Sequence, residues 1–214
     1  MARQLNIPAI PLFSSADKNY SSDATNQNNN VLRLFLIKLT NALNALFGSS
    51  GGIYINTPYG AFQDGTDQVA ANTTTAYAVT YDTTDFSNTI TLSNSSRLNV
   101  EYAGLYNVQF SIQFKNTTND TQDVDVWFRK NGTDIDKSNS KFGIPPRKSS
   151  GDPSHIVAAM NFYVSLEVND YIQIMWKPSD VGLSIEHYAA GTSPTRPAIP
   201  SAIVTMNFVS SIPT

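Results

Sequence analysis

The stretch GLYNVQFSIQF, residues 104–114, decides the fold because large apolar residues alternate with polar ones along it. An alternation with period two is typical of a strand that buries one face and leaves the other in water. The stretch therefore predicts a long antiparallel strand with two different faces. The inward set is Tyr106, Val108, Phe110, Ile112 and Phe114, and the outward set is Asn107, Gln109, Ser111 and Gln113.

The same alternation recurs on both sides of this stretch. Turn signals separate the alternating segments, for example at Gly65, Gly132 and Asn169. Such strands, joined by short turns, suit an all-β, two-sheet antiparallel sandwich of the jelly-roll type, which we expect over residues 58–214. The further alternating segments are residues 97–102, 123–128, 160–168, 171–176 and 204–209.

Some outward positions of these strands are large and apolar instead of polar. Contiguous exposed apolar surface usually marks an interface, so we expect one sheet to face a neighbouring subunit. These outward apolar residues are Leu105, Trp127, Tyr163 and Met175.

Residues 31–47, VLRLFLIKLTNALNALF, read as the one helix of the chain. Asn30 is a suitable N-cap and Gly48 a suitable stop, so we expect a short helix over residues 31–48, followed by a Gly/Ser-rich linker at 49–57. Leucines recur along it at spacings of four and three residues, which is the seam of a coiled coil. The seam consists of Leu32, Leu36, Leu39, Leu43 and Leu46.

Two interpretations of this helix stay open. The leucine seam favours self-association of several chains into a bundle at a common axis. The other apolar residues wrap nearly the whole circumference, which also fits burial against the chain's own β domain. In either case the helix must be covered on several sides.

Residues 1–30 are expected to form an extended anchor peptide and a tether. Apolar residues gather around two prolines near the start, and a polar tract follows that cannot bury enough surface to fold alone. An extended apolar peptide suits insertion into a partner's groove or addition to a sheet edge, whereas a disordered tail is the alternative. The anchor residues are Ile7, Pro8, Ile10, Pro11, Leu12 and Phe13.

The composition excludes several classes of protein. The 214 residues carry a net charge of −3 with scattered lysines and arginines, so we expect no nucleic-acid partner. The absence of cysteine excludes disulfides and cysteine-ligated zinc. The first residues lack the unbroken apolar run of a secretory signal, and residues 31–47 are too short and too polar for a bilayer, so we expect neither a signal peptide nor a membrane span.

We expect no enzymatic activity, no cofactor and no metal. His155 and His187 are the only histidines, and the motifs of nucleophilic, zinc-dependent and phosphate-binding catalysis are missing. A paired-carboxylate glycosidase is the alternative, because its two acids need only be close in space. Asp120, Asp123 and Asp125 are of the type that holds calcium, but the last two alternate with apolar positions as on the solvent face of a strand.

The segment from Ala76 to Val209 resembles the jelly-roll domains of the complement C1q and tumour-necrosis-factor group. The resemblance is carried by RLNVEYAGLYNVQFSIQF, residues 97–114, where Gly104, Tyr106 and Phe110 match that family's Gly-x-Tyr-x-x-x-Phe core strand. It implies a compact homotrimer around a threefold axis, with a helical or fibrous stalk before the β domain.

Further stretches are similar to a branch of this family that is common in structural proteins of tailed bacteriophages. They include DVDVWFRKNGTDID (residues 123–136) and VAAMNFYVSLEVNDYIQIMW (residues 157–176). The resemblance implies a non-enzymatic virion protein, such as a tail or head fibre, spike or decoration protein, that assembles in the host cytoplasm. Its partners would be capsid or tail proteins, reached through the N-terminal peptide. The alternative is an adhesin head that binds a host-surface glycan or receptor.

Overall fold

The computed structural model describes residues 7–13, 21–47 and 57–211. The chain divides into two compact units, Met1–Asn56 and Thr57–Thr214. Apart from Thr57, the predicted linker at residues 49–57 lies outside the described residues, as does the predicted helix stop at Gly48.

The first unit contains α1 (Ser22–Phe47), which is 26 residues long, or about 39 Å. The prediction that the helix starts after Asn30 was wrong. Ser21 caps the true start: its hydroxyl accepts a hydrogen bond from the amide of Ala24 at 3.3 Å, and its carbonyl accepts one from the amide of Thr25 at 3.1 Å. Residues 22–30 therefore belong to the helix and not to a tether. In the described ranges no helix, α1 included, is both long and apolar enough to cross a membrane.

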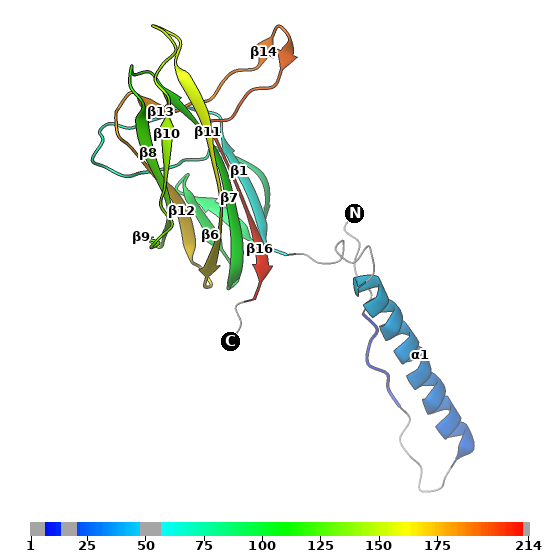
Figure 1. The fold of residues 1–214 in the computed structure, drawn as a ribbon. Helices are drawn as coiled ribbons and strands as arrows, with labels where there is room; N and C mark the ends of the chain where they lie inside the picture. The colour runs from blue at the N-terminus through cyan, green and yellow to red at the C-terminus, as the bar shows by residue number, and fades with distance from the viewer. Residues whose placement is uncertain (1–6, 14–20, 48–56, 212–214) are drawn as a thin grey trace. The chain divides into compact units, whose positions relative to one another are not determined.

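The second unit is a sandwich of two antiparallel sheets (Figure 1), which confirms the predicted all-β class with one helix ahead of it. The β7 sheet contains β1 (Tyr59–Asp64), β2 (Gln68–Val69), β4 (Thr83–Asn88), β7 (Gly104–Asn116), β11 (Ser154–Leu166), β13 (Leu183–Ile185) and β16 (Ala202–Ser210). The β8 sheet contains β3 (Tyr77–Ala78), β5 (Ile90–Ser93), β6 (Arg97–Val100), β8 (Gln122–Lys130), β9 (Thr133–Asp134), β10 (Ser140–Ile144) and β12 (Tyr171–Pro178).

Strand β7 contains the alternating stretch of residues 104–114 and lies inside the β7 sheet. One edge pairs with β11 along its whole length, and the other edge pairs with β16 and then with β13. Its predicted inward residues are at most 4% exposed, so the alternation was interpreted correctly. β1 pairs with β16 in the same sheet, and in the other sheet β12 pairs with β6 and β8 pairs with β10.

Aromatic rings from both sheets meet in the core. Phe110 of β7 lies 5.8 Å from Phe128 of β8, and Phe114 lies 5.9 Å from Trp176 of β12, measured between ring centroids. Phe128 also stacks on Phe162 of β11 at 4.8 Å. Each such pair contributes about 0.5–1.5 kcal/mol beyond the burial of its area, so these contacts fix the two sheets against each other.

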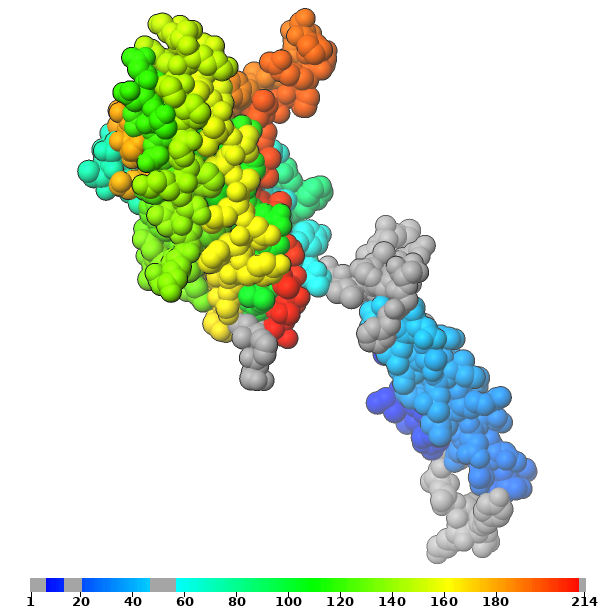
Figure 2. Space-filling view, in the orientation of Figure 1, coloured from blue at the N-terminus to red at the C-terminus, as the bar shows by residue number. Residues whose placement is uncertain are grey.

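Two pairs of strands are joined by tight turns. Asn131 and Gly132, with φ angles of 48° and 83°, form the tight turn between β8 and β9 that their sequence predicts. The proline-bearing segment near residues 190–200 contains a small hairpin of β14 (Gly191–Thr192) and β15 (Thr195–Arg196), which projects from the sandwich in Figure 2.

Candidate functional site

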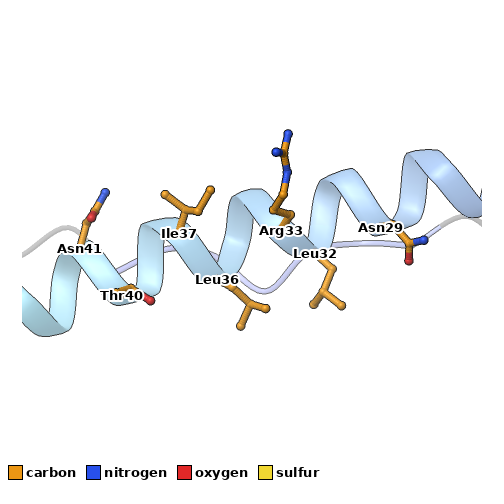
Figure 3. A pocket seen from close by; sticks show the side chains of 7 residues that line it. All are labelled: Asn29, Leu32, Arg33, Leu36, Ile37, Thr40 and Asn41. Carbon is orange, nitrogen blue, oxygen red and sulfur yellow. The ribbon is translucent and has the colours of Figure 1, made fainter.

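The leucine seam of α1 is largely uncovered. Leu32, Leu36 and Leu43 are 42%, 50% and 44% exposed, whereas Leu39 and Leu46 are half-buried. A shallow hollow of about 470 Å³ runs along the helix, and Figure 3 shows Leu32 and Leu36 pointing to the same side of it. Leucines at this spacing with this exposure form an apolar strip suited to another helix.

The predicted anchor residues lie in a described segment without regular secondary structure. Ile10 and Leu12 are 87% and 94% exposed, Ile7 and Phe13 are also exposed, and Pro8 and Pro11 are half-buried. The two prolines remove backbone donors and keep the chain out of a helix. Apolar side chains of this size at such exposure are available to a partner.

The outward face of the β7 sheet is rich in polar side chains, most of them amides. In one row across three strands, Tyr163 of β11 lies opposite Asn107 of β7, and Asn107 lies opposite Asn207 of β16. The next row places Asn161, Gln109 and Thr205 side by side in the same way. Tyr163 is 56% exposed, as its outward position predicted. The family-motif residues of β7 point the other way: Gly104, Tyr106 and Phe110 are all buried.

Asn107 stands out on this face. It is only 9% exposed, and its Oδ1 has no hydrogen-bond partner among the described residues. A buried acceptor without a partner costs about 1–3 kcal/mol, so this oxygen is a local weak point in the packing of the β unit. The outward face of the β7 sheet thus combines an exposed aromatic ring with rows of polar side chains.

The outward face of the β8 sheet carries a second feature, which the sequence did not reveal. A hollow of about 490 Å³ lies over β8 and β12, beside the connection from β9 to β10. We call it the Trp127 hollow. Its lining residues are Asp125, Trp127, Asp134, Ile135, Asp136, Lys137, Asn139 and Lys177. Of these, the sequence singled out only Trp127 and Asp125. Asp134 lies in β9, which is too short to show a period, Asp136 and Asn139 lie in the connection that follows, and Lys177 reads as an ordinary surface residue.

Met175 does not contribute to an exposed patch on this sheet, contrary to expectation. It is 3% exposed and lies opposite Trp127 of β8 on one side and Ala78 of β3 on the other. Strand β3, too short to be recognised from its sequence, flanks this part of β12. Trp127 itself is half-buried, and its indole nitrogen bonds to Asp134.

Both histidines are held by acidic or phenolic partners. His187 bonds to Asp67 through its backbone amide and through Nδ1, at 2.9 and 2.7 Å. Desolvation would raise the pKa of Asp67, but these bonds outweigh it and lower that pKa. In the described part of the chain, neither histidine ring bonds to a serine or threonine hydroxyl.

The second histidine belongs to a cross-strand cluster. His155 of β11 contacts the hydroxyl of Tyr188, which donates to Glu186 at 2.5 Å, and Glu186 in turn pairs with Lys115 of β7. Burial and the neighbouring Glu186 raise the pKa of Tyr188 well above its usual range, so its proton stays in place at neutral pH. The cluster ties together segments distant in sequence.

The acidic residues of β8 do not gather. Asp123 pairs with Lys141 at 3.8 Å and Asp125 faces solvent beside Asn139, while Val124 and Val126 fill the core. Within residues 7–13, 21–47 and 57–211, no group of three His, Asp or Glu side chains is arranged to hold a metal ion.

No protein-family model matches the chain, and a search of curated proteins finds no match.

Proposed function

We propose that this protein is a non-enzymatic structural protein of a tailed-phage virion. It is a homotrimer in which the N-terminal peptide attaches to capsid or tail proteins, α1 joins the three chains, and the β unit forms the projecting head. A tail or head fibre, a spike and a decoration protein are the forms this role takes, and assembly occurs in the host cytoplasm.

The exposed leucine seam is the observation that carries the proposal. Leu32, Leu36 and Leu43 each leave more than two fifths of their surface in water. Burying the remaining exposed part of each against two sister helices contributes about 0.7–1.5 kcal/mol per leucine, roughly half the value for a fully exposed side chain. Most of the stability of a helix in a protein comes from the packing of its apolar face, which a short bundle would supply here.

The strand pairing supports a jelly-roll head. In a jelly roll, a long antiparallel hairpin is wrapped around a barrel, so the first strand pairs with the last and each later strand with the next one inward. The pairs β1–β16, β6–β12, β7–β11 and β8–β10 follow that rule. This order agrees with the C1q and tumour-necrosis-factor type that the core motif of β7 resembles, whose members are compact trimers.

The outward face of the β7 sheet is the head's proposed subunit contact. Its exposed Tyr163 offers apolar area to a neighbouring subunit. The exposed residues Ile10 and Leu12 are left for the particle, where an apolar peptide without regular structure fits a groove or a sheet edge.

Light scattering on the full-length protein after size exclusion tests the trimer. We expect the mass of three chains, and a stable monomer would reject the proposal. The double variant Leu36→Asn with Leu39→Asn should weaken trimerisation. Leu34→Asn is the matched control, because Leu34 is 53% exposed but lies off the seam. An unchanged oligomer in the double variant would assign trimerisation to the β heads alone.

The particle attachment has a separate test. Deleting residues 7–13 should leave the trimer intact, since these residues lie outside the seam, but should remove the protein from purified phage particles. Quantitative mass spectrometry of the particles measures the copy number. Equal copy numbers with and without the segment would reject its role as the anchor.

A further inference from the structure

We propose that the Trp127 hollow is a binding site for a neutral saccharide. This inference goes beyond the structural role proposed above and depends neither on the trimer nor on attachment to a particle. It rests on the volume of the hollow, on the side chains that line it and on how firmly the backbone of its wall is held.

The hollow has the volume of a small-ligand site and a mainly polar lining. Its volume of about 490 Å³ falls within the range of about 300–1,000 Å³ that is usual for such sites. One aromatic side chain, Trp127, lies among amide, carboxylate and ammonium groups. A pyranose ring has an apolar face of C–H groups and an edge of hydroxyls, so it can use both the ring and the polar groups at once.

Most of the polar side chains that line the hollow have no strong hydrogen-bond or ion-pair partner within the described part of the chain. In the described part of the chain, Asp136, Lys137 and Lys177 form no side-chain hydrogen bond or ion pair. The carboxylate of Asp125 accepts only one long hydrogen bond, at 3.5 Å from the side-chain amide of Asn139. These side chains therefore keep the donors and acceptors that sugar hydroxyls require, because a hydroxyl both donates and accepts.

The charges favour a neutral ligand. Asp134 is engaged by Trp127 and Arg129, which leaves two carboxylates, Asp125 and Asp136, and two lysines, Lys137 and Lys177. These four charges cancel. A phosphate or another strongly charged ligand would meet as much repulsion as attraction, whereas hydroxyl groups bond well to either sign.

The wall of the hollow is fixed before any ligand arrives. Ser138 is buried, its hydroxyl accepts from the amide of Phe128 at 3.1 Å and donates to the carbonyl of Ile135 at 2.8 Å. The amide of Ile135 donates to the carbonyl of Phe128 at 2.9 Å. These hydrogen bonds hold the connection from β9 to β10 against β8, the strand that carries Trp127. A preorganised wall loses little conformational entropy on binding, which benefits a weak polar ligand most.

Saturation-transfer difference NMR on the full-length protein tests the site. The probes are glucose, galactose, mannose and N-acetylglucosamine, each at millimolar concentration. We expect transfer to the ring C–H protons of at least one sugar. In a heteronuclear spectrum the indole N–H signal of Trp127 should shift with that sugar, while the signal of Trp176, 1% exposed in the core, stays in place.

Three variants locate the binding. Trp127→Ala should weaken it about tenfold or more, as the loss of one good contact implies. Asp136→Ala should weaken it too, and it leaves the fold alone because Asp136 is exposed and unbonded. Tyr163→Ala is the matched control, an exposed aromatic residue on the other sheet. The proposal is overturned if no sugar in the panel gives transfer, or if transfer persists in both Trp127→Ala and Asp136→Ala.

Discussion

The indole Nε1 of Trp127 donates a hydrogen bond to Oδ1 of Asp134 at 2.8 Å, from one strand of the β8–β9 hairpin to the other. The same oxygen accepts a bond from Nε of Arg129 at 2.6 Å. The two donors hold the carboxylate at the rim of the Trp127 hollow and fix the plane of the indole ring. A substitution of either donor should therefore change the pKa of Asp134.

The Arg129 bond lowers the pKa of Asp134, partial burial opposes it, and the Trp127 bond lowers it further. We expect Arg129→Gln to raise the pKa of Asp134 toward about 3.9, and Trp127→Phe to raise it less. Carboxyl chemical shifts followed in a pH titration give the value directly. The assignment fails if Arg129→Gln leaves this pKa where it is in the wild type.

Asp170 predicts how stability depends on acid. Burial would raise its pKa, but bonds from Lys130 at 2.7 Å, the amide of Glu167 and Asn131 outweigh this and lower it. A carboxyl with a depressed folded pKa stabilises the protein above its unfolded pKa of about 3.9, and this contribution is lost as pH falls through the folded value.

Asp170→Asn should therefore cost about 1–3 kcal/mol at neutral pH, and the difference from the wild type should shrink below about pH 4. Urea denaturation at several pH values measures both. A constant difference across this range would mean that the charge of Asp170 is not what stabilises the turn between β11 and β12.

Gly104 predicts a packing defect. A Cβ at this position would run into the ring of Phe208 and lie 2.9 Å from the carbonyl oxygen of Ser210. Gly104→Ala should destabilise the β unit by about 1–3 kcal/mol, read from its thermal or denaturant midpoint. Gly143→Ala is the control, because a Cβ there meets Asp123 at an ordinary 3.6 Å. Similar losses for both glycines would contradict the steric explanation.

Ser21 predicts a loss confined to the helix. Ser21→Ala removes the hydroxyl that accepts from the amide of Ala24 and should cost about 1 kcal/mol of helix stability. Far-UV circular dichroism during a thermal melt detects the earlier loss of helix signal. Ser22→Ala, one residue inside α1, should change the melt much less. Equal effects of the two variants would contradict the assignment of Ser21 as the N-cap of α1.

Periodicity made the strands of the β unit predictable. Along β7 every inward residue recognised in the sequence is buried, because a two-residue period has only one way to face a core. The start of α1 was not predictable in the same way. An asparagine-rich tract disfavours a helix by composition, yet a helix that is already nucleated downstream extends through it at low cost until Ser21 supplies a cap.

The Trp127 hollow escaped prediction for a different reason. Trp127 and Asp125 are visible as outward residues of a strand, but Asp136 and Asn139 come from a connection whose path is set by the buried hydroxyl of Ser138. A serine in a polar stretch carries no sign that its side chain will bond to the backbone of a strand ten residues earlier. Met175 illustrates the same limit, since its burial depends on pairing with the short strand β3.

The pairing of β16 also bears on how the protein is made. β16 covers one edge of β7 and one edge of β1, although it is synthesised after both of them. Until it emerges, both strands offer open edges that can pair with other chains. Chains that stop before β16 thus cannot close the sandwich, and the finished head can form only after β16 has been synthesised. Truncated copies would be diverted to aggregation or proteolysis before assembly.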